Sequence, residues 1–148
     1  MPGIEYAMRF PAVLREALQS DLVKLPNIVQ TNFGKIHGFR GVKIKKGEGK
    51  RALTRADFNS QIEQHQTNPS LLVDLNNWGS YSCSCFTSKE ALEIGFHLPR
   101  KGKGIAEGSI TDKYGPIIHD HPHVHWFLYD DADPSSEFSI IEVCDESL

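Results

Sequence analysis

The spacing of apolar residues divides the chain into helical and extended stretches. Apolar residues recur every three or four positions from Phe10 to Leu25, which predicts a helix with one buried face that ends before Pro26. Thr54 and Asp57 form a variant of the capping box, so a second helix begins there and continues to about Asn68. The sequence Thr87-Ser88-Lys89-Glu90 matches the capping box and predicts a third helix, from about Ser88 to Leu92 or Ile94.

Two stretches alternate in the manner of half-buried strands. In 81–86, Ser82, Ser84 and Phe86 share one face, whereas Tyr81, Cys83 and Cys85 share the other. A strand that begins near His123, after Pro122, places Val124, Trp126 and Leu128 in the core. Its other face carries His123, His125, Phe127 and Tyr129. Further extended segments are expected at 28–33, 35–44, 94–98, 105–110 and 138–143.

Helices that precede a mostly antiparallel set of strands predict an α+β fold, with N-terminal helices packed against the sheet. At 148 residues, with 39% hydrophobic and 24% charged residues, the chain fits a single globular domain. The N-terminus lacks the basic and apolar regions of a signal peptide, and no apolar run reaches the length of a membrane span. We therefore expect a soluble, cytoplasmic protein without a membrane partner. The odd number of cysteines, three, favours reduced thiols.

A net charge of −3 gives the chain no overall attraction for nucleic acid, so we do not expect a nucleic-acid partner. The charge is nevertheless uneven. Basic residues gather at 43–55 and 100–103, and no Lys or Arg follows Lys113. This asymmetry is typical of electrostatic pairing between two parts of one domain.

Four of the seven histidines, at 119, 121, 123 and 125, occupy every second position. Two imidazoles at i and i+2 on a strand can bind the same metal ion, and the spacing resembles the His-x-His of cupins. The further histidine of the cupin pattern has no counterpart after His125. We therefore assign no metal, and keep His121, His123 and His125 as the alternative metal-ligating set.

Three separated segments carry a second pattern: Phe39-Arg40-Gly41, the Ser82-Cys83-Ser84 strand that leads into a helix, and Glu137 before the last strand. Their order resembles the arginine-serine-glutamate class of ADP-ribosyltransferases, as found in bacterial and phage toxins and effectors. The resemblance implies that NAD is the substrate. It implies that Arg40, with Phe39 and Gly41 beside it, binds the phosphates, because a guanidinium offers them a bidentate fork.

By the same resemblance, Ser82 and Ser84 would support the nicotinamide ribose. Glu137 would be the catalytic carboxylate that stabilises positive charge as nicotinamide leaves. Glu142 is the fallback carboxylate. The sequence departs from the family pattern at Cys83, where Thr is usual, and at Ser135, where the transferases usually carry Glu or Gln. These departures leave NAD hydrolysis and modification of a macromolecular acceptor both open.

Two other kinds of function remain open from the sequence. The first is a noncatalytic, partner-binding protein of the immunity or regulatory type. The second is a metal-independent ribonuclease, in which His123 or His125 acts as general acid and base while Arg40 or Lys43 binds phosphate.

Overall fold

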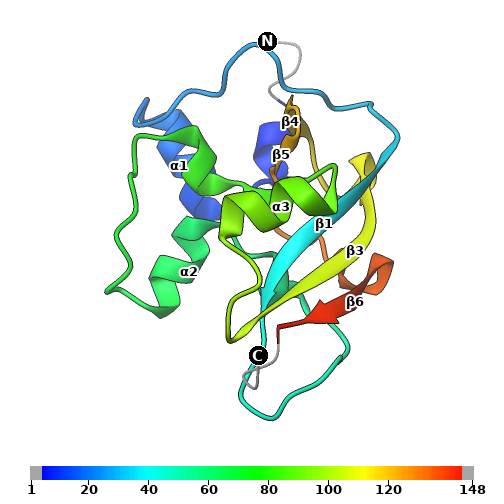
Figure 1. Ribbon diagram of the computed structural model, residues 1–148. Coiled ribbons are helices and arrows are strands. Elements are labelled where there is room, and N and C mark those ends of the chain that lie inside the picture. Colours follow the sequence, from blue (N-terminus) through cyan, green and yellow to red (C-terminus); the bar gives the residue numbers. More distant parts are fainter. Residues whose placement is uncertain (1–4, 145–148) are drawn as a thin grey trace.

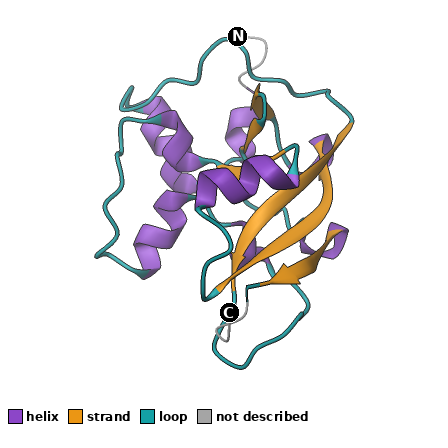
Figure 2. Cartoon of the chain, viewed as in Figure 1, coloured by secondary structure: helices purple, strands orange, loops and turns teal. Residues whose placement is uncertain are grey.

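A computed structural model describes residues 5–144 (Figures 1 and 2). Its helices are α1 (Ala12–Gln19), α2 (Gln61–Thr67) and α3 (Lys89–Phe96). Its strands are β1 (Lys35–Lys43), β2 (Cys83–Phe86), β3 (Lys103–Thr111), β4 (Ile117–Asp120), β5 (His123–Trp126) and β6 (Phe138–Val143). Short 3₁₀ helices are η1 (Glu5–Arg9), η2 (Arg55–Phe58), η3 (Trp78–Tyr81), η4 (Asp112–Tyr114) and η5 (Ser135–Glu137).

The six strands form one antiparallel sheet in the order β4-β5-β2-β1-β3-β6. Helix α3 lies across β1, and α1 and α2 lie together to one side of the sheet (Figure 1). The α+β class predicted from the sequence is confirmed. None of the helices in residues 5–144 is both long enough and apolar enough to span a membrane.

The core has two main clusters because the sheet and the N-terminal helices bury different sets of residues. One cluster joins the inward faces of the strands through Val42, Cys83, Cys85 and Trp126 to Phe58 of η2. The other packs Leu14 of α1 against residues that follow β5, including Phe127 and Tyr129. The prediction that Val124, Trp126 and Leu128 belong to the core is confirmed.

The strand around His123 is shorter than its alternation predicts. It ends at Trp126, and Phe127 and Tyr129 are buried, at 0% and 6% exposure, instead of continuing the histidine face. The reason is tertiary, because these two rings pack around Phe10 just before α1.

The first helix also ends earlier than predicted, at Gln19 rather than near Leu25. Asp21 takes a left-handed backbone conformation (φ 60°), and the Leu22 N–H returns to the Ala17 carbonyl at 3.0 Å. This bond terminates the helix while Val23 stays buried.

The helix predicted from Thr54 is split in two. The Thr54 N–H donates to the Asp57 carboxylate at 2.9 Å, as the capping box predicts, but only the 3₁₀ turn η2 follows. Asn59 is extended, and Ser60 then caps α2 in a second capping box with Glu63. This second box restarts the helix in a new direction.

The third helix begins where predicted, with Ser88 as its N-cap, but continues to Phe96. The extended segment expected at 94–98 is therefore wrong at Ile94 to Phe96. Segment 28–33 contributes a single bridge, between Gln30 and Ile117, and not a strand. The segments at 35–44, 105–110 and 138–143 are confirmed as β1, β3 and β6.

Candidate functional site

A cleft of about 580 Å³ opens where β1 and β2 diverge. β1 pairs with β3 along its whole length, from Lys35 with Thr111 to Lys43 with Lys103. Its register with β2, in contrast, consists of the Phe39–Phe86 pair. Beyond that pair, the Arg40 side chain of β1 bonds to the Ser84 carbonyl of β2 and to carbonyls of the segment that carries η2.

The cleft is lined mostly by polar residues from separate parts of the chain. β1 contributes Arg40, Gly41, Val42 and Lys43. The η2 and α2 segment contributes Ala56, Asp57, Asn59, Gln61, Gln64 and Thr67. The remaining walls are Asn77, Gly79, Ser80, Ser82, Ser84, Phe96, Lys103, His123 and His125. Of the residues that the resemblance assigned to NAD, the fold thus brings together Arg40, Gly41, Ser82 and Ser84.

Arg40 ties three segments together at the floor of the cleft. Its guanidinium donates to the carbonyls of Asp57 at 3.1 Å, Asn59 at 3.0 Å and Ser84 at 2.8 Å. The residue is only 6% exposed. A guanidinium has five N–H groups, so two remain for a ligand after these three bonds. Arg40 therefore holds the cleft in shape and still offers donors to an anion.

Two serine–histidine pairs cross from β2 to β5. The Ser82 hydroxyl lies 3.2 Å from His125 Nδ1, and the Ser84 hydroxyl forms a short hydrogen bond with His123 Nε2. The two imidazoles are neighbours, with ring centroids 3.9 Å apart. Aromatic rings hold them on either side, since Phe86 stacks on His123 at 4.8 Å and Trp78 meets His125 edge-on at 4.7 Å.

Both imidazoles are neutral at neutral pH. Burial lowers the pKa of His123. Burial, and then the neighbouring His123, lower the pKa of His125 to about 4, against a smaller opposing effect of Asp120. A charged imidazole would lose hydration here and repel its neighbour, so the pair favours the unprotonated form.

The cleft also carries positive charge. Arg40, Lys43 and Lys103 line it, and Asp57 is the carboxylate among the lining residues. Asp57 is already engaged, because Arg51 donates to both of its oxygens at 2.8 Å. Burial, then Arg100, Lys43 and Arg40, lower the pKa of Lys103. A bound anion would relieve this repulsion.

Three residues named from the resemblance do not line the cleft. Phe39 packs against His37, at 5.2 Å between ring centroids, and against the cluster beneath α3. Glu137 lies in η5 and pairs with Lys113 at 3.7 Å. Glu142 of β6 pairs with Lys89 at 3.1 Å.

The position of Glu137 follows from the strand order. β6 is separated from β1 by β3, which places its backbone two strand spacings, about 10 Å, from that of β1. Phe138 pairs with Gly108, whereas Arg40 pairs with Ala106. Glu137 is therefore offset along the sheet as well, and the fold does not bring it to the serines.

The histidines of the alternative metal set are divided between two places. His121 lies in the turn between β4 and β5, where its Nδ1 is 3.3 Å from the Thr87 hydroxyl. His123 and His125 face the cleft and the serines. In the described part of the chain, no group of three or more His, Cys, Asp or Glu residues is arranged to hold a metal ion.

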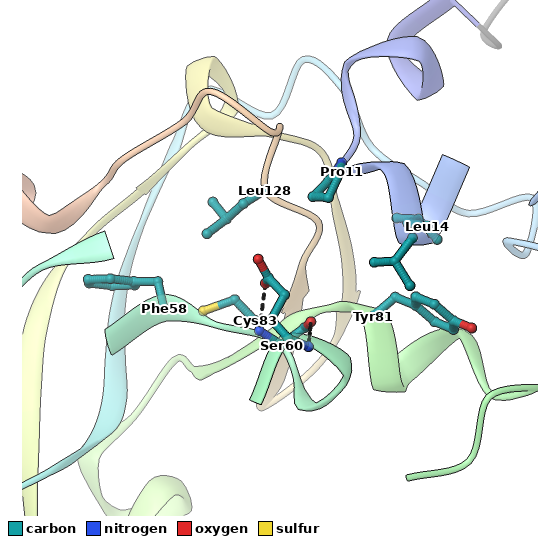
Figure 3. A pocket seen from close by; sticks show the side chains of 9 residues that line it. Pro11, Leu14, Phe58, Ser60, Tyr81, Cys83 and Leu128 are labelled. Carbon is teal, nitrogen blue, oxygen red and sulfur yellow. Dashed lines mark hydrogen bonds between the residues drawn. The ribbon is translucent and has the colours of Figure 1, made fainter. Parts of the chain in front are cut away.

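The cysteines belong to the core. Cys83 and Cys85 are 2% and 0% exposed, with their sulfur atoms 3.9 Å apart and not bonded as a disulfide. Cys83 borders a small pocket of about 10 Å³, with Leu14, Phe58, Tyr81 and Leu128 around it (Figure 3). The pocket lies where the two core clusters meet and has room for about one water molecule.

Sequence reasoning treated the serines and the histidines as separate sites. Both Ser82-x-Ser84 and His123-x-His125 follow the two-residue period of a strand, so each pair is expected on one face of its own strand. Only the pairing of Ser84 with His125 in the β2–β5 register joins them. No motif in the sequence indicated that Asn59, between η2 and α2, or Gln64 of α2 would line the cleft.

Comparison of the chain with protein-family models, with curated proteins and with solved structures found no match.

Proposed function

We propose that the protein binds NAD in the cleft between β1 and β2 and cleaves its nicotinamide–ribose bond. One observation carries the proposal. Arg40, Ser82 and Ser84, which the resemblance to the arginine-serine-glutamate ADP-ribosyltransferases assigns to NAD, come from two separate segments and line one cleft. Its volume of about 580 Å³ lies within the range of small-molecule and cofactor sites.

The charge of the cleft suits the pyrophosphate of NAD. Arg40, Lys43 and Lys103 supply three positive charges, whereas Asp57 is neutralised by Arg51. Charge-assisted hydrogen bonds to phosphate oxygens are stronger than neutral ones. The phosphates would thus bind at the β1 and β3 side of the cleft.

The other side suits a ribose. Ser82, Ser84, His123 and His125 present hydroxyl groups and neutral imidazoles. Sugar hydroxyls need both donors and acceptors, and a neutral imidazole supplies one of each. The nicotinamide ribose would therefore lie against β2 and β5. Hydrolysis and transfer to a macromolecular acceptor differ only in the group that attacks this ribose.

Ribonuclease activity is the second candidate, since Arg40, Lys43, His123 and His125 also converge on the cleft. A general acid and a general base would both be needed. The lowered pKa values of both histidines leave neither of them protonated at neutral pH in the free protein. NAD cleavage needs no general acid, because nicotinamide leaves as a neutral molecule.

We expect NAD binding to depend on the lysines of the cleft. Replacing both Lys43 and Lys103 by Ala should weaken the NAD affinity measured by calorimetry by about 10- to 100-fold, because contacts to a charged group contribute about 1.5–3 kcal/mol. Lys46→Ala, in the exposed loop after β1, is the matched control and should change the affinity by less than about 2-fold.

Chromatography of nicotinamide tests the cleavage step. If the wild-type protein fails to bind NAD at about 1 mM, or binds it equally well without the two lysines, the proposal fails. Cleavage of an RNA oligonucleotide in place of NAD would favour the ribonuclease.

A further inference from the structure

The hydrogen bonds around Ser82 determine which nitrogen of His125 carries a proton. The Ser82 hydroxyl lies 3.0 Å from the Gly79 carbonyl and 3.2 Å from His125 Nδ1. A carbonyl can only accept, so the single hydroxyl proton is donated to Gly79. The hydroxyl oxygen must then accept from Nδ1. His125 is therefore the tautomer with its proton on Nδ1 and a lone pair on Nε2.

The lone pair on Nε2 is available to a ligand. Within residues 5–144, Nε2 of His125 makes no hydrogen bond. It is also not among the buried side-chain atoms that lack a hydrogen-bond partner, which are Thr111 Oγ1 and His119 Nε2. Nε2 of His125 is thus open to solvent, although the ring as a whole is largely buried, and the ring lines the cleft. The edge-on contact with Trp78 fixes the plane of the ring.

His125 thus has the features of a general base, whereas the nearby carboxylates are already engaged. Glu137, which the resemblance assigned to catalysis, and the fallback carboxylate Glu142 pair with lysines outside the cleft. Asp57, the carboxylate in the cleft, is held by Arg51 through both oxygens. His125 is half-buried, held by Ser82 and neutral, and it lies beside the serines.

We propose that His125 Nε2 accepts the proton of the water molecule that attacks NAD in this cleft. This inference rests on the proposed NAD cleavage. The C–N bond between ribose C1′ and nicotinamide breaks, and its electron pair leaves with neutral nicotinamide. A C–O bond forms between C1′ and water, one water proton passes to Nε2, and the products are ADP-ribose, nicotinamide and a proton.

The basicity of His125 is adequate for this step. The pKa of His125, about 4, is close to that of an ordinary carboxylate, the group that the resemblance assigned to this reaction. A weak base suffices because water becomes strongly acidic as it bonds to an oxocarbenium-like carbon. The low pKa also keeps Nε2 unprotonated throughout the neutral range.

The titratable groups around His125 come from several elements. His123 lies on the same strand, and Asp120 ends β4. Arg40 and Lys43 of β1, Lys103 of β3 and Asp57 of η2 face the same cleft. Because His123 lowers the pKa of His125, replacing it by neutral Gln should raise that pKa.

Steady-state kinetics and NAD binding are measured for the wild type, His125→Gln, His123→Gln and Glu137→Gln. His125→Gln should bind NAD with an affinity within about 3-fold of wild type. Its rate of nicotinamide release should be lower by a factor of at least about 100, as expected for loss of a general base. Glu137→Gln should keep its turnover. His37→Gln, an exposed histidine of β1, is the control for histidine replacement and should match wild type.

The pH dependence of kcat/KM gives a second, independent readout. The acid limb of His123→Gln should move to higher pH than in the wild type, whereas a distant carboxylate base would leave it in place. Wild-type turnover that persists in His125→Gln, or an acid limb that does not move in His123→Gln, would overturn the role of His125. A wild type that does not bind NAD, or that binds it without releasing nicotinamide, would instead overturn the proposed function.

Discussion

Arg40 is the residue on which the shape of the cleft depends most. Its three hydrogen bonds run to carbonyls of Asp57, Asn59 and Ser84, so one side chain joins β1, the η2 segment and β2. The Asn59 carbonyl also accepts from the Gln64 side chain at 3.2 Å, whereas Arg40 is the side-chain donor to the carbonyls of Asp57 and Ser84. The position of Arg40 in a structural role does not conflict with anion binding, because two of its N–H groups remain for a ligand.

Replacement of Arg40 by Ala should lower the free energy of unfolding by about 3 kcal/mol, because three part-buried carbonyls lose a buried, charged donor. Urea denaturation followed by circular dichroism measures the change. Arg100→Ala, an exposed arginine before β3, should stay within about 0.5 kcal/mol of wild type. Equal stabilities of the two variants would show that Arg40 does not hold these segments together.

At the scale of elements, the close approach of β3 and β6 sets the far edge of the sheet. Gly108 of β3 has so little room that a Cβ atom would lie 2.2 Å from the Glu137 carbonyl and 2.5 Å from the Phe138 ring. Glu137 is the last residue of η5, and Phe138 is the first residue of β6. The close packing of these two strands therefore keeps Glu137 at the far edge of the sheet, away from the cleft.

Gly108→Ala should therefore destabilise the protein by about 2–3 kcal/mol, since backbone rather than a flexible side chain must move. Thermal unfolding followed by circular dichroism is the measurement. Gly49→Ala, at an open loop position with no atom within 4 Å of the added Cβ, should have the same melting temperature as wild type within a few degrees. A Gly108→Ala protein as stable as Gly49→Ala would contradict the close approach.

At the scale of the whole molecule, folding buries two neutral histidines side by side. Their pKa values are lowered in the folded state, by burial first, from an ordinary value of 6.5. Between that value and the folded value of His125, about 4, the unfolded chain binds more protons than the folded one. The stability contributed by the neutral pair is present above pH 6.5 and decreases as the pH falls toward 4.

We expect the urea midpoint to fall from pH 7 to pH 4.5, and to fall less in the double variant His123→Gln and His125→Gln. Asp57 adds a separate loss at lower pH. Burial alone would raise its pKa, but hydrogen bonds from Arg51 and the Thr54 N–H outweigh burial and lower it. The loss from Asp57 begins only near the ordinary carboxyl pKa, about 4. Identical pH dependence of wild type and double variant above pH 5 would rule out the histidine contribution.

Local sequence determined which strands and caps form. The alternation of Ser82, Cys83, Ser84 and Cys85 and the capping residues Thr54 and Ser88 act through nearest neighbours, so they could be predicted and are found in place. The α+β class followed from the same signals. Two predictions failed for different reasons. The end of α1 is set locally by Asp21 and the bond from the Leu22 N–H to the Ala17 carbonyl, whereas beyond Trp126 packing against the distant Phe10 outweighed the local period.

The sequence predicted several residues of the site but not how these residues come together. Arg40, Gly41, Ser82 and Ser84 could be named from short motifs, but their meeting depends on the divergence of β1 from β2. The pairing of β2 with β5 brought His123 and His125 to the serines, and the place of β6 beyond β3 kept Glu137 away. Residue types and periods are local properties of the chain, whereas strand order and register arise from packing across the whole sheet. Tertiary structure therefore decided which of the candidate residues share one cleft.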